Sequence, residues 1–162
     1  MAGRAEHPTS AKRSLDLATN LYRLGGGGKG GEDHYEAALQ KYLRALEIIE
    51  SGVDADPSME LQQKSILLTL IGVLYRRLNH PSQAMKWFHR SIEFLPSHDG
   101  HYHLAMTLAL EGKCVASAAE LAKAMSFSVM DADFRLLSTL LSACGLWVRL
   151  EAFLRRCIQG IW

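Results

Sequence analysis

Residues 68–96 read LTLIGVLYRRLNHPSQAMKWFHRSIEFLP, and the architecture of the chain can be worked out from this segment. Its apolar side chains recur every three to four residues, which is the period of an amphipathic helix. The pattern breaks near Asn79, a turn former, and Pro81 suits the first turn of a new helix because no hydrogen bond is lost there. The segment therefore predicts two helices joined by a short turn.

A repeat with a period of 33 residues extends from this helix pair. Small residues stand at Gly72, Ala105 and Ser138, and a second series stands at Ser91, Ala124 and Cys157. Seven positions after the first two of them stand the turn formers Asn79 and Gly112. Small side chains let the two helices of a pair approach closely, and larger neighbours fill the groove between them. A unit of this kind cannot bury its apolar face alone, so we expect successive units to stack.

At this spacing the sequence resembles the tetratricopeptide repeat (TPR). The best-matching unit carries the family's signature at Leu68, Ile71, Gly72, Tyr75, Ala84, Phe88 and Pro96. The resemblance implies an all-α fold, a right-handed α-solenoid of about four helix-turn-helix repeats or about eight helices. Leu150 departs from the pattern, because the family has a small residue there.

The resemblance also gives the domain organisation. Residues 1–10 are expected to be a flexible N-terminal segment, and residues 11–162 a single TPR-like domain. The repeats are expected at about 11–50, 58–96, 99–129 and 131–162. A glycine-rich insert at 25–31 interrupts the first repeat and is expected to be non-helical.

The family's role is protein recognition, through a concave groove lined by the first helix of each pair. Carried onto this sequence, the groove residues are Lys12, Tyr22, Arg23, Thr69, Val73, Arg76, Arg77, Tyr102, Met106 and Arg135. Their cationic, apolar and aromatic groups would suit an acidic and apolar segment of a partner. A competing interpretation is that Arg76 and Arg77 only stabilise a helix C-terminus, where basic residues are favoured.

The layout is also similar to the TPR domains of immunophilin-type co-chaperones. Those domains hold the C-terminal carboxylates of large chaperones with lysine, asparagine and arginine side chains. The matching positions here are Leu15, Thr19, Leu70, Asp99 and His103, and none carries the required residue. The resemblance therefore does not extend to a carboxylate clamp.

Two segments carry residues that could suggest a chemical site. The glycine-rich insert contains Lys29, but a phosphate-binding loop needs a preceding strand and a following Ser or Thr, and Gly30 follows here. A second candidate is the cluster of His98, Asp99, His101 and His103. A metal site needs converging ligands, but residues two apart on a helix, such as His101 and His103, point away from each other. We interpret the cluster as a polar helix start, with a metal-binding or enzymatic accessory role, or a pH-sensitive contact in the groove, as the alternatives. No catalytic residue, metal or cofactor is predicted.

The end of the chain offers a second candidate interface at Phe153, Ile161 and Trp162. Either the last helix packs inward and caps the array, or its apolar edge docks on a partner or on a second copy of the chain. The second reading would make the protein a homodimer or a structural subunit of a larger assembly. It is the alternative to an adaptor that binds through its groove.

Composition limits the other function classes. The net charge is +1 at pH 7, so neither nucleic acid nor a membrane surface is expected as a partner. No apolar run approaches the roughly 20 residues that span a bilayer. Three widely spaced cysteines, Cys114, Cys144 and Cys157, predict reduced, buried thiols, and hence a cytoplasmic or nuclear protein.

Overall fold

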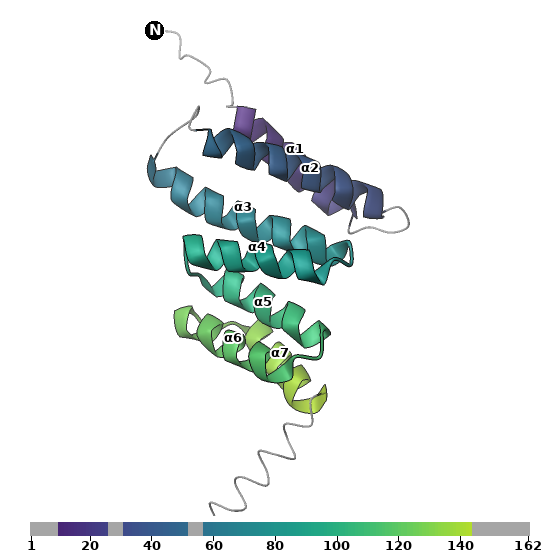
Figure 1. Cartoon of the computed structure of the whole chain (residues 1–162), viewed down its shortest axis with the longest axis vertical. Helices are drawn as coiled ribbons and strands as arrows, with labels where there is room; N and C mark the ends of the chain where they lie inside the picture. Colours follow the sequence, from purple (N-terminus) through teal and green to yellow (C-terminus); the bar gives the residue numbers. More distant parts are fainter. Residues whose placement is uncertain (1–9, 26–30, 52–56, 144–162) are drawn as a thin grey trace, which may run out of the picture. The chain divides into compact units, whose positions relative to one another are not determined.

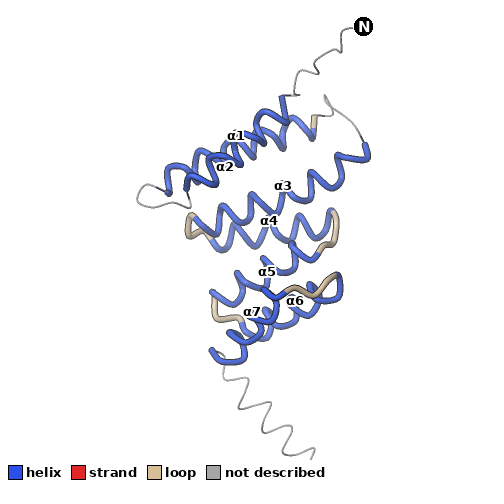
Figure 2. Tube along the Cα trace, turned by 180° about the vertical axis from the view of Figure 1, so that it is seen from behind, coloured by secondary structure: helices blue, strands red, loops and turns tan. Residues whose placement is uncertain are grey.

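The computed structural model describes residues 10–25, 31–51 and 57–143. These residues form α1 (Ser10–Gly25), α2 (Gly31–Glu50), α3 (Pro57–Arg77), α4 (Pro81–Phe94), α5 (His98–Leu110), α6 (Cys114–Phe127) and α7 (Asp131–Ala143). No strand occurs among them (Figure 2). The all-α prediction is confirmed, and the eighth helix expected near the C-terminus lies outside the described residues.

The chain divides into two compact units between Pro96 and Ser97. In unit 1, α1 packs on α2, α3 packs on α4, and α2 lies against α3 (Figure 1). In unit 2, α5 packs on α6, and α7 contacts both of them. Each unit is therefore built around helix pairs, as the repeat predicts, while the expectation of a single domain over residues 11–162 stays a prediction.

The turns inside the helix pairs follow the repeat closely. Among the described residues, positive φ angles occur at Asn79 (59°) and Gly112 (72°), which are 33 residues apart in the sequence. At the first turn, Asn79 N–H donates to Arg76 O and His80 N–H donates to Tyr75 O. Asn and Gly tolerate this left-handed conformation, and the two hydrogen bonds cap the helix C-terminus. The predicted turn formers are confirmed at both positions.

The small residues of the repeat permit close helix contacts. A Cβ added at Gly72 would lie 2.5 Å from Cε1 of Phe88, whose side chain is fully buried. In unit 2, Ala105 is fully buried, and its carbonyl accepts a hydrogen bond from the Ser117 hydroxyl at 2.6 Å. The two helices of a pair thus approach closely at Gly72 and at Ala105, which are positions of the small-residue repeat.

Each unit has an apolar cluster of its own. The cluster of unit 1 includes Ala38, Tyr42, Leu68, Ile71 and Leu74, which come from α2 and α3. The cluster of unit 2 consists of Ala105, Leu121, Leu136 and Leu140, with one or two residues from each of α5, α6 and α7. Burial of this apolar surface is the main stabilising contribution in each unit.

The glycine-rich insert is shorter than the sequence suggests. Gly25 and Gly31 were expected to be non-helical, but Gly25 ends α1 and Gly31 begins α2, and residues 26–30 lie outside the described residues. A Cβ at Gly25 would approach Cε1 of Tyr35 to 2.5 Å. The expectation is wrong at both ends of the insert, because the two helices converge there and glycine leaves room for the contact.

The prediction of reduced thiols is wrong at Cys114, which is disulfide-bonded. This residue begins α6 and is half-buried. Cys144 and Cys157 lie outside the described residues. The cysteine pattern therefore gives no support to a reducing compartment. Separately, none of the described helices is long and apolar enough to cross a membrane.

Candidate functional site

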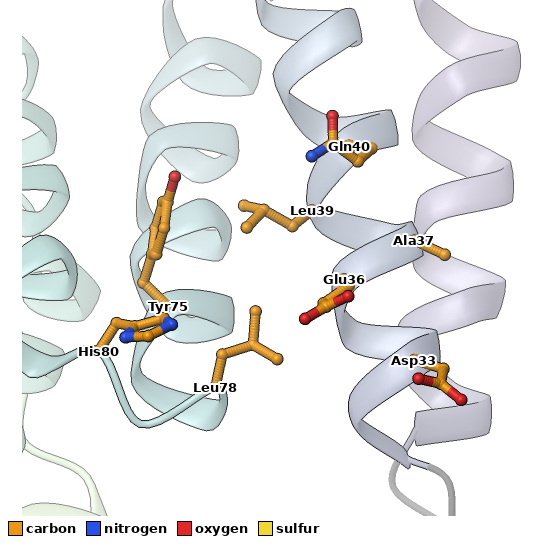
Figure 3. A pocket seen from close by; sticks show the side chains of 8 residues that line it. All are labelled: Asp33, Glu36, Ala37, Leu39, Gln40, Tyr75, Leu78 and His80. Carbon is orange, nitrogen blue, oxygen red and sulfur yellow. The ribbon is translucent and has the colours of Figure 1, made fainter.

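A hollow with a volume of about 510 Å³ opens in unit 1 beside α2 (Figure 3). Its walls come from α2, the last turn of α3 and the turn that follows. The lining residues are Asp33, Glu36, Ala37, Leu39, Gln40, Tyr75, Leu78 and His80. The hollow therefore lies between neighbouring helix pairs, where the second helix of one repeat meets the first helix of the next.

The helical period places the polar residues of α2 along this hollow. Asp33, Glu36 and Gln40 are spaced three and four residues apart, so they share one face of the helix. Figure 3 shows Glu36 and Leu39 extending from α2 toward Leu78 and Tyr75. The site thus combines carboxylates with an apolar surface.

The wall on the α3 side is held in place by aromatic packing. The rings of Tyr75 and Trp87 stack nearly parallel, with centroids 6.4 Å apart and planes 11° apart. The guanidinium of Arg90 lies 5.1 Å from the centroid of the Trp87 ring. Stacking of this kind restricts the rotamers of the side chains, so the hollow is shaped before any ligand arrives.

The carboxylates of the hollow lack cationic partners. Asp33 and Glu36 are both exposed, and within the described residues no ion pair joins either to a lysine, arginine or histidine. Glu50 on the same helix differs, since it pairs with Lys64 at 3.2 Å and with Arg90 at 2.7 Å. Two uncompensated negative charges beside Leu39 and Leu78 suit a cationic group that is attached to an apolar stem.

The structure separates the predicted groove residues of unit 1 into two groups. Arg23 and Arg77 are exposed, while Tyr22 and Arg76 are half-buried. The ring of Tyr22 packs at 5.8 Å from the ring of Tyr35 across the α1–α2 pair. These side chains still reach the surface, whereas the side chain of Lys12 is outside the described part of α1.

Thr69 and Val73 form the second group, because their side chains are only 6% and 5% exposed. The Thr69 hydroxyl lies 2.8 Å from the Ser91 hydroxyl and donates to the carbonyl of Ser65. It therefore belongs to a buried polar contact between α3 and α4. In this conformation neither Thr69 nor Val73 presents a side chain to a partner.

In unit 2, Arg135 is exposed on α7, and Tyr102 and Met106 are half-buried on α5. Both α5 residues pack against the apolar cluster of that unit. The residues proposed for the end interface, Phe153, Ile161 and Trp162, lie outside the described residues. The structure thus describes groove candidates within each unit separately.

The histidine cluster is a structural feature that the sequence interpretation missed. The cluster lies at the start of α5 as the sequence predicts, but His98 and His101 are buried, at 8% and 7% exposure. His98 contacts Asp133 of α7, and Nδ1 of His101 lies 2.7 Å from Oε2 of Glu120 in α6. Each carboxylate comes from a different helix, and no local spacing in the sequence signals these pairs.

These contacts shift the pKa values of His98 and Glu120. Burial lowers the pKa of His98, but its hydrogen bonds with Asp133 and Asp99 outweigh burial, so the pKa is raised. Burial raises the pKa of Glu120, but hydrogen bonds from Lys123 and His101 outweigh it, so the pKa is lowered. Both histidines are engaged by carboxylates, and within the described residues no group of three or more His, Cys, Asp or Glu is arranged to hold a metal ion.

Comparison with known proteins places this architecture. No family model matches the sequence, and no curated protein matches it either. A solved structure does match: the C-terminal TPR-containing domain of a Plasmodium falciparum protein described as an FK506-binding protein. The TM-score is 0.52 at 15% sequence identity, over 91% of this chain and 97% of that domain.

The chain has a TPR-like fold. The helix pairs, the small residues at their contacts and the capped turns at Asn79 and Gly112 are the TPR features that the sequence predicted. At this level of identity the likeness shows the fold alone, and a TPR scaffold serves many unrelated processes.

Proposed function

We propose that this TPR-like chain is a protein-interaction adaptor, without catalysis of its own, that binds a segment of a partner protein. The observation that carries the proposal is the hollow in unit 1, where carboxylates that form no ion pair with any described residue stand beside apolar side chains between two helix pairs. Grooves between helices are common sites for peptide recognition. The fold supports the same conclusion, since stacked helix pairs leave extended surfaces for contact.

The chemistry of the hollow favours a partner segment with a lysine or arginine next to an apolar residue. Glu36 and Asp33 would attract the charged group, and Leu39 and Leu78 would contact the apolar one. Exposed charge pairs contribute about 0.2–1 kcal/mol each. Loss of both would therefore weaken binding by about 2- to 30-fold, since 1.4 kcal/mol corresponds to a factor of ten.

The first helices offer a second contact of opposite charge. Arg23 and Arg77 are exposed at the C-terminal ends of α1 and α3, and Ile66 on α3 is 58% exposed. We propose that this cationic face, together with Arg76, binds acidic and apolar residues of a partner. In unit 2 the same proposal assigns Tyr102, Met106 and Arg135 to the contact. The competing role for Arg76 and Arg77 is stabilisation of the end of α3.

The test uses the full chain as bait in cell extract, followed by affinity measurement with each captured protein. One variant, Asp33→Asn with Glu36→Gln, neutralises the hollow, and its matched control is Asp16→Asn with Glu93→Gln, two exposed carboxylates on α1 and α4. A second variant, Arg23→Glu with Arg77→Glu, reverses the cationic face. Its control is Lys41→Glu with Lys86→Glu, which reverses two exposed charges on α2 and α4.

We expect a partner whose affinity drops in one site variant and stays unchanged in its control. Loss in the hollow variant alone would assign the hollow, and loss in the arginine variant alone would assign the first-helix face. A partner that all four variants bind with the affinity of the wild type would refute both surfaces. It would direct attention to the alternative of a structural subunit docked through Phe153, Ile161 and Trp162, or of a homodimer.

A further inference from the structure

We propose that the contact between His98 and Asp133 is a pH-sensitive latch, which holds α7 against α5 while His98 is protonated. This inference concerns unit 2 alone and does not depend on the adaptor proposal. The two residues are 35 positions apart and meet only because α7 folds back onto α5.

The geometry places a carboxylate oxygen opposite each ring nitrogen of His98. Nε2 lies 3.0 Å and 3.1 Å from the two carboxylate oxygens of Asp133, and Nδ1 lies 3.2 Å from Oδ1 of Asp99. A neutral imidazole carries one N–H, whereas the imidazolium carries two. Only the protonated ring can donate a hydrogen bond to both carboxylates.

Loss of the proton forces a choice between two poorer arrangements. If Nε2 keeps the N–H, Asp133 keeps its donor, but the lone pair of Nδ1 faces the Asp99 carboxylate. If Nδ1 keeps the N–H, the lone pair of Nε2 faces Asp133, whose side chain is fully buried. A buried carboxylate that loses a charged partner is destabilised strongly, because little solvent is available to replace it.

Asp133 also closes the first turn of α7. Its Oδ2 accepts a hydrogen bond from the backbone N–H of Met130 at 2.8 Å, and its own N–H donates to the Met130 carbonyl at 2.9 Å. The Asp133 side chain thus caps the backbone N–H of Met130, as the N3 residue of a capping box does, and this contact helps to fix the start of the helix. The residue that contacts His98 therefore organises the beginning of α7, and a change at His98 acts directly on that helix.

The helices described in unit 2 bring further groups near His98. On α5, the ring of Tyr102 stacks on the imidazole with centroids 5.7 Å apart and planes 12° apart, which favours a cationic ring. On α6, the charged groups nearest the cluster, Glu120 and Lys123, pair with each other, and Glu120 also contacts His101. Within residues 97–143, Asp99 and Asp133 are thus the carboxylates that face His98.

The latch controls access to the apolar cluster of unit 2. Leu136 and Leu140 bring α7 into this cluster, and Tyr102 and Met106 of α5 pack against it. Release of the start of α7 would expose these two α5 side chains to solvent. The raised pKa of His98 sets the sign of the pH dependence. The latch is closed below the pKa that His98 has in the folded protein, and it weakens as pH rises through that pKa.

The experiment measures amide hydrogen exchange of α7 in the full chain across pH 5.5 to 8.5, corrected for intrinsic exchange, beside an NMR titration of His98. We expect the protection of the amides of residues 133–140 to fall several-fold as pH rises. The midpoint of this fall should coincide with the midpoint of the His98 titration. His98→Gln, which keeps an amide donor but does not titrate, should remove this pH dependence. His101→Gln is the matched control and should leave it in place.

Two results would overturn the latch: protection of α7 that does not vary with pH in the wild type, or a pH dependence that persists in His98→Gln. Asp99→Asn covers the case in which His98→Gln fails to fold. The Asp99 side chain is 69% exposed, so this change should leave the fold intact. It should move the midpoint of α7 protection to lower pH, and an unmoved midpoint would also refute the proposal.

Discussion

Gly72 of α3 and Phe88 of α4 touch so closely that a single added carbon at Gly72 would lie 2.5 Å from the ring. Phe88 is fully buried, so its ring cannot turn out into solvent to make room. The pair fixes how near the two helices of this repeat can lie. It also explains why glycine occurs in the middle of α3, where it costs about 1 kcal/mol relative to alanine.

Gly72→Ala should therefore destabilise unit 1 despite the better helix propensity of alanine. Overpacking of a core costs about 1–3 kcal/mol and alanine regains about 1 kcal/mol of helix propensity, so we expect a net loss of stability of up to roughly 2 kcal/mol in urea unfolding. Combination with Phe88→Leu should recover part of the loss, which a double-mutant cycle would detect as coupling. Additive effects of the two substitutions would contradict a direct steric contact.

Gly112→Ala should destabilise unit 2 for a different reason. No atom lies within 4 Å of a Cβ at this position, so space is available, but the φ of 72° disfavours an L side chain. We expect a loss of about 1–2 kcal/mol for alanine and a smaller one for asparagine, which occupies the equivalent turn at Asn79. Equal stability of the alanine variant and the wild type would show that the turn can relax.

Asp133→Ala should detach α7, because it removes both the cap of this helix and the partner of His98. Removal of one member of a buried charged pair costs about 3–5 kcal/mol. We expect lower helix content by circular dichroism and faster exchange of the α7 amides. Asp131→Ala is the control, since Asp131 is exposed in the same first turn and should cost under about 1 kcal/mol.

Glu120 should give unit 2 a dependence on acid that is opposite in sign to that of His98. Its pKa is lowered, so the ionised carboxylate contributes stability above the ordinary value of 4.5 and loses it as pH falls through the folded value. The free energy of unfolding of the wild type, measured in urea, should fall below about pH 4.5. Glu120→Gln should be less stable at pH 6 and should lose less on acidification; parallel pH profiles would refute this role.

The sequence determined the repeat and its local consequences. The 33-residue spacing predicted the helix pairs, the close contact at Gly72 and the turns at Asn79 and Gly112, because period, side-chain size and left-handed turn residues act over a few positions. Pro81 likewise marked the start of α4. These features depend on the chain's own geometry, which a sequence displays directly.

The sites depended on contacts between residues far apart in the sequence. The groove assignment from the family pattern included Thr69 and Val73, yet both are buried, and only packing around α3 decides that. The hollow joins Glu36 to Leu78, and no pattern along α2 alone indicates a wall from the end of α3.

The histidine cluster shows the same division most clearly. The sequence placed His98 at the start of a helix but gave no sign of Asp133, which reaches it from α7 through the packing of Leu136 and Leu140. The amphipathic period fixes which residues form a helix, because it is a local property. Which charged groups meet inside the protein is set by how the helices pack, and that was decided by the tertiary structure alone.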